Sequence, residues 1–476
     1  MSSSRLPAPR PPRRLRRLAL LAGLAGIFTA SAMAGWAVGD PSAFAAALDG
    51  IARSTDPTAS PAASGAPATP GPTPAPGQTA GPGPTASPTP TPTPTPTPSP
   101  SPVPAVPKAM AARLDKALAS AQSSLLLPGV EATVIFADGS TWTGVRGMAD
   151  VADGRRVDPE TPFAIASVTK TFTAALILRY VDQGRIRLDD PLSRWLPEWP
   201  NARKITVRML LNHTSGIPDF FRNPAFDVAL NKDKKRSWTT AEVLAKFVRP
   251  GAVFAPGKGW SYSNTNYLLL GIVAATVGGA SWEELVRREL IEPLGLDSTY
   301  VQGAEEPPVR PARAYRIIAG ARGPTPQART DGTDVVPFTS VTTAAGSAGA
   351  IASTSTDLAR WTRALYGGTL LSAATRREML TFVKAYAYGL GTAYGLGVSR
   401  VTFQGRISYG HSGALAGTRA AIRYFAKDKV TVAVLFNRET FVGDDVTRIL
   451  ARALFPKPPA TASPSPGTSP RPTSAP

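Results

Sequence analysis

Residues 163–178 read FAIASVTKTFTAALIL, an apolar stretch of helical length that contains a single lysine. Lys170 follows Ser167 by three residues, and residues three apart are neighbours on one face of a helix. Such a lysine has two interpretations. Either one face of the helix meets water, or the lysine amine faces the serine hydroxyl and takes its proton. The spacing alone does not separate them, so the rest of the chain has to be consulted.

The catalytic interpretation has a definite chemical requirement. A serine hydroxyl is a poor nucleophile until a base takes its proton. A lysine can be that base only if burial or nearby positive charge lowers its pKa, and an apolar helix start provides burial. The S-x-x-K spacing occurs once in the chain, at Ser167 and Lys170. A motif this short arises by chance in a chain of this length, so further elements are needed.

Composition excludes several classes of chemistry. The 476 residues include no cysteine, which rules out disulfides, thiol catalysis and a lipid-modified cysteine anchor. Only two histidines occur, His213 and His411, so we expect no metal site and no cofactor. The formal net charge is +19. A basic surface of this kind attracts anionic wall polymers or lipid head groups, whereas the chain has no aromatic-basic motif for nucleic acid.

The chain divides into five segments of different composition. Residues 18–45 contain a long uncharged stretch preceded by arginines, which predicts either a cleaved signal peptide or a membrane anchor. In either case the rest of the protein is expected outside the cytoplasm. The other segments are a basic cytoplasmic arm at 1–17, a disordered Pro/Thr-rich stalk at 46–107, a globular block at 108–456, and a disordered Pro/Ser/Thr tail at 457–476.

Within the globular block, strands are expected near both ends and helices between them. The Ser167 helix should run to about Asp182 and stop at Gly184. Asp138-Gly139 is a hairpin signal between two strand-like runs. The terminal elements predicted from the pattern are an amphipathic helix at 110–126 and strands at 129–139, 140–150, 406–413 and 418–437. This arrangement predicts an α/β fold with a helical insertion.

A second polar element is Tyr262-Ser263-Asn264, in the stretch GWSYSNTNYLLLG. It directly precedes an apolar helix, so one interpretation is a capping loop, because Ser and Asn are good helix caps. The functional interpretation is a tyrosine that relays a proton and an amide that orients lysine and substrate.

A third element is Gly410-His411-Ser412-Gly413, on the predicted strand near the C-terminal end. Glycines allow another group to approach a strand closely. A nucleophile elbow on Ser412 would need a histidine later in the chain, and none follows His411. His213 precedes a turn, and we interpret it as structural.

Together these elements resemble the serine penicillin-recognising enzymes, which include class C β-lactamases, D-alanyl-D-alanine carboxypeptidases and related esterases. The resemblance covers essentially all of 108–456. It rests on the order and spacing of the Ser167, Tyr262 and His411 motifs, and on LLNHTSGIPD and GSAGAIASTSTDLARW, which look like landmarks of the family. The implied fold is an antiparallel sheet flanked by helices plus a mostly helical lobe, β-lactamase/transpeptidase-like.

The resemblance also implies roles for individual residues. Ser167 would be the acylated nucleophile, with Lys170 and Tyr262 as the acid/base pair. Asn264 would hold the lysine and the substrate amide. The residues implied in substrate binding, on or near the third-motif strand, are His411, Ser412, Gly413, Ala414 and Arg400. The backbone N–H groups of Ala414 and Ser167 would form the oxyanion hole. Arg400 could bind a substrate carboxylate.

The third motif reads His-Ser-Gly where class C β-lactamases carry Lys-Thr-Gly, and the His form is similar to that of the carboxypeptidases. We therefore expect an exported D-alanyl-D-alanine carboxypeptidase-like enzyme acting on peptidoglycan peptides. A β-lactamase or small-ester hydrolase on the same fold is an alternative. A non-catalytic, wall-tethered binding protein is another, although such a protein should have lost Ser167, Lys170 or Tyr262. Expected partners are a peptide, β-lactam or ester substrate, cell-wall polymers and, through 18–45, a membrane, but no nucleic acid.

Overall fold

The computed structural model describes residues 103–456 except 322, 386–392 and 440–443. The predictions for 1–17, 18–45 and 457–476, and for nearly all of 46–107, lie outside the described residues and stay predictions.

The described chain is built around one antiparallel sheet in the order β3-β2-β1-β14-β13-β12-β11-β10-β9. Strands from the two ends of the block meet in its middle, because β1 pairs with β14 from Val130–Phe436 to Ile135–Thr431. The predicted Asp-Gly hairpin is confirmed as β1 and β2. The strands are β1 Gly129–Ile135, β2 Thr141–Asp150, β3 Arg155–Arg156, β9 Val383–Lys384, β10 Ala393–Tyr394, β11 Ser399–Phe403, β12 Arg406–Leu415, β13 Thr418–Phe425 and β14 Val430–Phe436.

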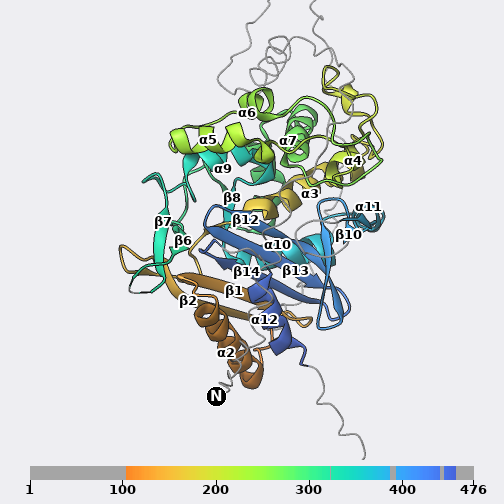
Figure 1. Ribbon diagram of the computed structural model, residues 1–476. Coiled ribbons are helices and arrows are strands. Elements are labelled where there is room, and N and C mark those ends of the chain that lie inside the picture. Colours follow the sequence, from red (N-terminus) through yellow and green to blue (C-terminus); the bar gives the residue numbers. More distant parts are fainter. Residues whose placement is uncertain (1–102, 322, 386–392, 440–443, 457–476) are drawn as a thin grey trace, which may run out of the picture. The chain divides into compact units, whose positions relative to one another are not determined.

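Helices cover both faces of this sheet (Figure 1). One face packs on α2 (Lys108–Ser124) and α12 (Asp445–Leu454), through alternate residues of β1 and β14 such as Val134 and Val434. The other face packs on α10 (Ser355–Gly367) and the rest of the core. Because β1, β13 and β14 are buried along their whole length, apolar and exposed polar residues do not alternate in them, and the few polar residues they contain, such as Glu131 and Arg423, are buried as well.

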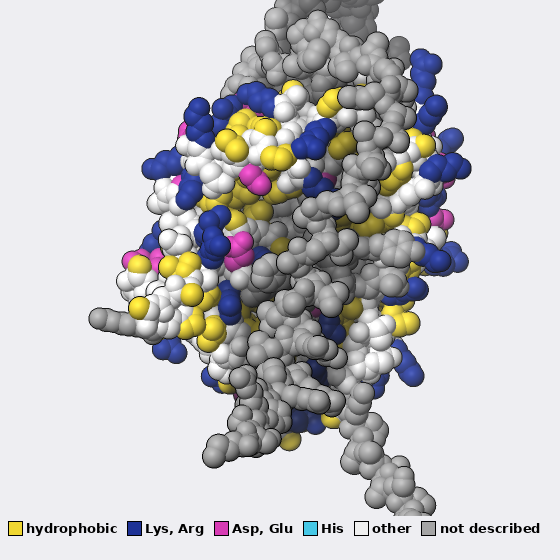
Figure 2. Space-filling model, viewed as in Figure 1, with side chains coloured by type: hydrophobic (Ala, Val, Ile, Leu, Met, Phe, Trp, Pro, Cys, Tyr) yellow, Lys and Arg dark blue, Asp and Glu magenta, His cyan; other side chains and the backbone are white. Residues whose placement is uncertain are grey.

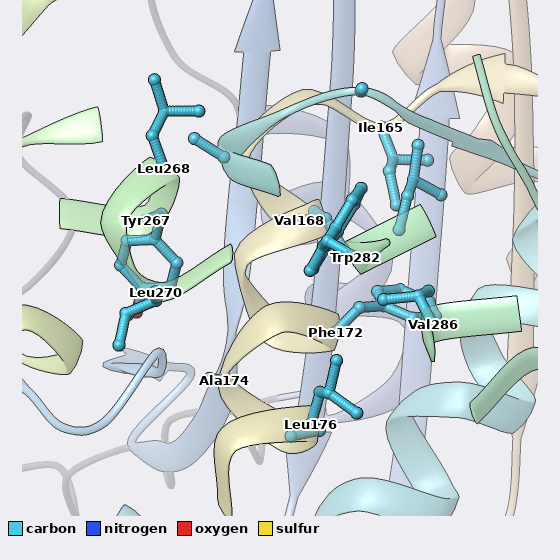
Figure 3. Packing of buried hydrophobic residues seen from close by; sticks show 14 of the residues in the cluster. Ile165, Val168, Phe172, Ala174, Leu176, Tyr267, Leu268, Leu270, Trp282 and Val286 are labelled. Carbon is cyan, nitrogen blue, oxygen red and sulfur yellow. The ribbon is translucent and has the colours of Figure 1, made fainter. Parts of the chain in front are cut away.

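The predicted Ser167 helix is confirmed as α3 (Thr169–Asp182), which ends before Gly184 at φ +72°. Nearly all its side chains are buried, and Phe172 stacks on Trp361 with ring centroids 3.9 Å apart. Figure 3 shows α3 between α7 (Asn264–Gly278) and residues of α8 (Trp282–Val286). The remaining helices are α4 Val207–Leu211, α5 Pro224–Lys232, α6 Thr240–Phe247, α9 Thr339–Ala345 and α11 Ala373–Met379.

The middle of the chain is less purely helical than predicted. It also contains a small sheet of β4 (Phe163–Ala164), β8 (Ile351–Ser353) and β5 (Tyr300–Val301). A separate hairpin joins β6 (Ala314–Ile318) to β7 (Thr325–Arg329). Strands of two or three residues are too short to show an alternating pattern, and β7 is largely exposed and polar, so these strands have little signal in the sequence.

Helix α7 is apolar on nearly all sides, which is typical of a buried core helix or of a membrane span. Residues 265–271 of α7 are buried among other helices of the lobe. Among the described residues, no helix alone has the length and apolarity to cross a membrane, and only the bent pair Asn264–Gly278 and Trp282–Leu294 meets both measures when counted together.

We predict that a truncated chain of residues 103–456 folds on its own. All buried hydrophobic residues of the described structure lie between Leu114 and Leu454, so the truncated chain contains the whole of this core. The truncated and full-length chains should melt in one cooperative transition at temperatures within a few degrees of each other, as measured by circular dichroism. A broad, non-cooperative melt of the shorter chain would show that a boundary is misplaced.

Candidate active site

Ser167 lies in a single 3₁₀ turn, Ala166–Val168, between strand β4 and helix α3. The preceding Ala166 has φ +48°, a left-handed conformation that is unfavourable for a residue with a Cβ atom. Strand β8 holds this turn in place. Ile165 donates its N–H to the carbonyl of Ile351 at 3.0 Å, and the N–H of Ile351 donates to Thr169 Oγ1 at 3.1 Å. Strain of this kind persists where the surroundings fix it, as at many functional sites.

Lys170 is completely buried, so it does not face water. Its Nζ lies 3.1 Å from Ser167 Oγ, 2.7 Å from Asn264 Oδ1 and 2.7 Å from the carbonyl oxygen of Ala348. These three acceptors match the three protons of an ammonium group. Burial nevertheless lowers the pKa of Lys170 to about 7, although the negative charge of Asp219 acts in the opposite direction. The amine is therefore partly neutral near pH 7 and stands next to the serine hydroxyl, as a general base must.

Asn264 is the first residue of α7, and its side chain bridges Lys170 and Asp219. Its Oδ1 accepts from Lys170, while its Nδ2 donates to Asp219 Oδ1 at 3.1 Å and to Oδ2 at 3.2 Å. Asp219 Oδ1 also accepts the backbone N–H groups of Asn264 and Phe221. This aspartate therefore fixes which end of the amide faces the lysine.

Asp219 was missed as a site residue by the sequence reasoning. It ends the LLNHTSGIPD stretch and caps the 3₁₀ turn Phe220–Arg222, a position where aspartate is common for local reasons. Its contact with Asn264 joins residues 45 positions apart in the chain. Burial raises its pKa, whereas the hydrogen bonds from Asn264 and the charge of Lys170 act to lower it.

Tyr262 lies next to Lys170 and lines the cavity described below. Lys170 Nζ is 5.0 Å from the centre of the Tyr262 ring. The same ring lies 4.4 Å from His213 and 6.4 Å from His411, measured between centroids. The structure thus brings together the serine and lysine of the first motif and the tyrosine of the second.

His213 supports this arrangement from behind. It is fully buried, at φ +64°, and its Nδ1 accepts the backbone N–H of Ser263 at 3.2 Å. Burial, and then the charge of Lys170, lower its pKa well below the usual value, so it is neutral. Its position behind the Tyr262–Asn264 loop agrees with the structural interpretation.

The third motif lies on β12, beside Ser167. Strand β11 pairs with β12 only from Arg406 to Gly410. In the described part of the chain, residues 411–415 of β12 therefore have no partner strand on that side. Gly413 is essential to the close approach, because a Cβ atom there would lie 2.0 Å from the carbonyl oxygen of Ile165. The open edge can pair with an extended substrate.

His411 is buried and neutral. Its Nε2 accepts from the Tyr394 hydroxyl at 2.8 Å and its Nδ1–H donates to the carbonyl of Ser412 at 2.7 Å. Burial, and then the positive charge of Lys170, lower the pKa of His411 to about 3. At neutral pH this position therefore contributes no positive charge.

The structure does not bring Arg400 to the site. It is exposed on β11, with its guanidinium 4.9 Å from the centre of the Phe382 ring, and it does not line the cavity that contains Ser167. Side chains alternate along a strand, and the sequence did not reveal which face Arg400 would occupy. The expected contact with a substrate carboxylate therefore has no geometric support.

One cavity of about 1030 Å³ joins the predicted residues. This volume is large enough for a peptide-sized ligand. Of the predicted site residues, those that line it are Ser167, Tyr262, Asn264, His411, Ser412, Gly413 and Ala414.

The fold and this site define a serine hydrolase with a β-lactamase/transpeptidase-like fold. The chain belongs to the Beta-lactamase family, whose model matches residues 114–456. This family of serine hydrolases includes penicillin-binding proteins, so the family expected from the three motifs is confirmed.

Three similar proteins illustrate the family. Penicillin-binding protein 4* of Bacillus subtilis (strain 168) is 28% identical over 303 residues, which cover 62% of this chain and 64% of that protein. A D-stereospecific amidohydrolase from Streptomyces sp. has a TM-score of 0.61 and 30% identity, covering 73% of this chain and 98% of that chain. The D-amino acid amidase from Ochrobactrum anthropi SV3, complexed with L-phenylalanine amide, has a TM-score of 0.63 and 28% identity. The match covers 73% of this chain and 96% of that chain.

We predict that Asp219→Asn shifts the acidic limb of the pH–rate profile to lower pH. The base form of Lys170 is neutral, so acylation should fall as pH drops below its pKa of about 7. The charge of Asp219 raises that pKa, and asparagine removes the charge while keeping an oxygen for Asn264. Single-turnover acylation from about pH 5 to about pH 9 measures the shift. A limb displaced to higher pH would contradict this electrostatic role.

We predict that Gly413→Ala reduces acylation by about 10²-fold or more, because even small misplacement of reacting groups has this effect. The added methyl would meet the Ile165 carbonyl, so β12 must move away from the Ser167 turn. Acylation rates and melting temperatures should be measured together. Parent-like acylation in the folded variant would show that this contact does not position the site.

Proposed function

We propose that this protein is an exported serine hydrolase that forms an acyl-enzyme on Ser167 and cleaves peptide-type bonds next to D-amino acids. The observation that carries the proposal is the buried amine of Lys170, 3.1 Å from Ser167 Oγ and with a pKa of about 7. A merely structural lysine has no need of this placement, because burying its amine is costly.

The reaction follows from the positions of these groups. Ser167 Oγ attacks the substrate carbonyl carbon while Lys170 Nζ takes the hydroxyl proton. The carbonyl oxygen becomes an oxyanion, and the backbone N–H groups of Ser167 and Ala414 are the donors proposed to stabilise it. The carbon–nitrogen bond then breaks, and the leaving nitrogen receives the proton through the Lys170–Tyr262 pair. Water attacks the ester by the reverse sequence, which releases the acid and frees Ser167.

Peptides containing D-amino acids are the substrate class that the similar proteins favour. Two of the three are named for action on D-configured substrates, and the third is a penicillin-binding protein. The open edge at residues 411–415 supports binding of an extended peptide. The D-alanyl-D-alanine carboxypeptidase expected from the sequence is the form of this reaction in which the leaving group is free D-alanine.

The surface charge and the terminal segments support action at the cell wall. Figure 2 shows many Lys and Arg side chains and few acidic ones on the visible face, in keeping with the net charge of +19. Such a field increases the local concentration of anionic wall polymers. The basic arm, the apolar segment 18–45 and the Pro/Thr-rich stalk support export and tethering outside the cytoplasm.

We predict that Ser167→Ala abolishes covalent labelling and that Lys170→Ala and Tyr262→Phe each slow it by at least about 10²-fold. Lys116→Ala, on an exposed face of α2, is the matched control and should label at the parent rate. The probe is a labelled penicillin or fluorophosphonate, and the modified peptide is identified by mass spectrometry. Hydrolysis of an acyl-D-Ala-D-Ala peptide, a chromogenic β-lactam and a short-chain ester then distinguishes the peptidase from the alternatives. Labelling that persists in Ser167→Ala would refute the assignment.

A further inference from the structure

The hydroxyl of Ser412, in the third motif, is held by a buried ion pair that the catalytic scheme does not use. Arg423 on β13 and Asp444 before α12 are both completely buried, with Arg423 Nη2 2.6 Å from Asp444 Oδ2. Arg423 Nη2 also lies 2.7 Å from Ser412 Oγ, and Ser412 Oγ lies 3.1 Å from Asp444 Oδ2. The three groups form a closed triangle, and Ser412 is its only member that lines the cavity.

The chemistry of the two partners fixes the direction of these hydrogen bonds. A guanidinium only donates, and a carboxylate paired with it only accepts. Ser412 Oγ therefore accepts from Arg423 and donates its single proton to Asp444. A hydroxyl has one donor and two acceptor sites, so what remains for a ligand is a lone pair. Ser412 accordingly presents an acceptor to the cavity.

The positive charge of Arg423 is not offered to substrate either. Asp444 neutralises it, and Nη1 donates to Ser399 Oγ at 3.1 Å. The neighbouring His411 is neutral and Arg400 lies elsewhere. The sequences of 386–392 and 440–443, which flank residues of the cavity wall, contain no charged residue.

Ser412 lies on the leaving-group side of the site. The leaving nitrogen must be near the group that protonates it, and Tyr262 is adjacent to His411, the residue before Ser412. In the proposed reaction the leaving portion of the substrate would therefore lie toward this part of β12, where Ser412 lines the same cavity as Tyr262. The arginines that line the cavity are Arg222, Arg316, Arg419 and Arg438. Of these, Arg419 pairs with Ala414 of the third-motif strand, and its Nη1 donates to the carbonyls of Leu415 and Thr418.

We propose that Arg423 and Asp444 are positioning residues that fix Ser412 as a hydrogen-bond acceptor, and that the enzyme thereby selects leaving groups that end in an N–H donor over those that end in a free carboxylate. This inference rests on the proposed function and specifies its substrate. A C-terminal amide, or a peptide that continues beyond the leaving residue, donates to Ser412 Oγ. A terminal carboxylate instead meets a lone pair of Ser412 Oγ, next to an ion pair whose two charges cancel. The carboxypeptidase form of the reaction is therefore disfavoured.

A matched pair of peptides tests this preference on the full-length protein. Acetyl-D-Ala-D-Ala and its C-terminal amide differ only in the group that reaches Ser412. We expect kcat/KM for cleavage between the two alanines to be at least about 10-fold higher for the amide. Chromatography of the products separates D-alanine from D-alaninamide, so cleavage of the terminal amide itself is not counted.

The variant Asp444→Asn should shift this ratio toward the acid by about 10-fold. The asparagine amide can donate to Ser412 Oγ, which frees the hydroxyl proton for a carboxylate, and Arg423 loses its counter-charge. Asp428→Asn is the matched control, because it makes the same change in net charge and breaks another Asp–Arg pair, with Arg406, at the β13–β14 turn. A purely structural role for Asp444 would lower both rates and leave their ratio unchanged.

Each outcome separates the inference from the proposed function. A parent enzyme that prefers the acid, or an Asp444→Asn ratio that moves no more than that of Asp428→Asn, overturns the inference while the acyl-enzyme on Ser167 stands. If Asp444→Asn does not fold, Ser412→Ala decides, since removal of the acceptor should reduce the amide preference toward one. Failure to cleave either peptide, with no label on Ser167, overturns the proposed function and this inference with it.

Discussion

The site depends on a buried amine that must find three acceptors. Each acceptor of Lys170 comes from a different segment: Ser167 from the turn before α3, Asn264 from the start of α7, and the Ala348 carbonyl from the turn before β8. A buried cation without such partners would be very unfavourable, so these segments are fixed relative to one another by one nitrogen atom. Burial lowers the pKa of Lys170 and the charge of Asp219 raises it, and the resulting value of about 7 suits a base at neutral pH.

The surrounding fold also keeps the strained backbone at Ala166 in place, next to the Lys170 nitrogen. The left-handed Ala166 places Ser167 at the cavity, and β8 and Gly413 hold the turn from two directions. The core helix α3 supplies rigidity, since it is buried along nearly its full length between α7 and residues of α8 (Figure 3). A nucleophile held by such a rigid part of the fold moves little, which favours a reaction that requires accurate positioning.

The sequence predicted the elements whose signal is local. Helix α3, the β1–β2 hairpin and the terminal strands follow from apolar runs and turn residues, and the three motifs are short stretches with meaningful spacing. What it missed depends on contacts between distant positions. Asp219 and Asp444 both look like ordinary helix caps, and only the fold shows one beside Asn264 and the other beside Ser412. The sequence of a strand also does not say which face meets the cavity, so it could not show that Arg400 lies outside the cavity lining.

The net charge of the chain differs from the charge at the third motif inside the cavity. Positive charge is spread over the face seen in Figure 2, and such charge acts in solution over about a Debye length. At the third motif, His411 is neutral and Arg423 is paired with Asp444, so neither residue presents a free cation to the cavity. A site meant to hold a terminal carboxylate would need a cation there, because buried charges require partners. The proposed attraction to an anionic wall can therefore coexist with the proposed selection of an uncharged leaving group.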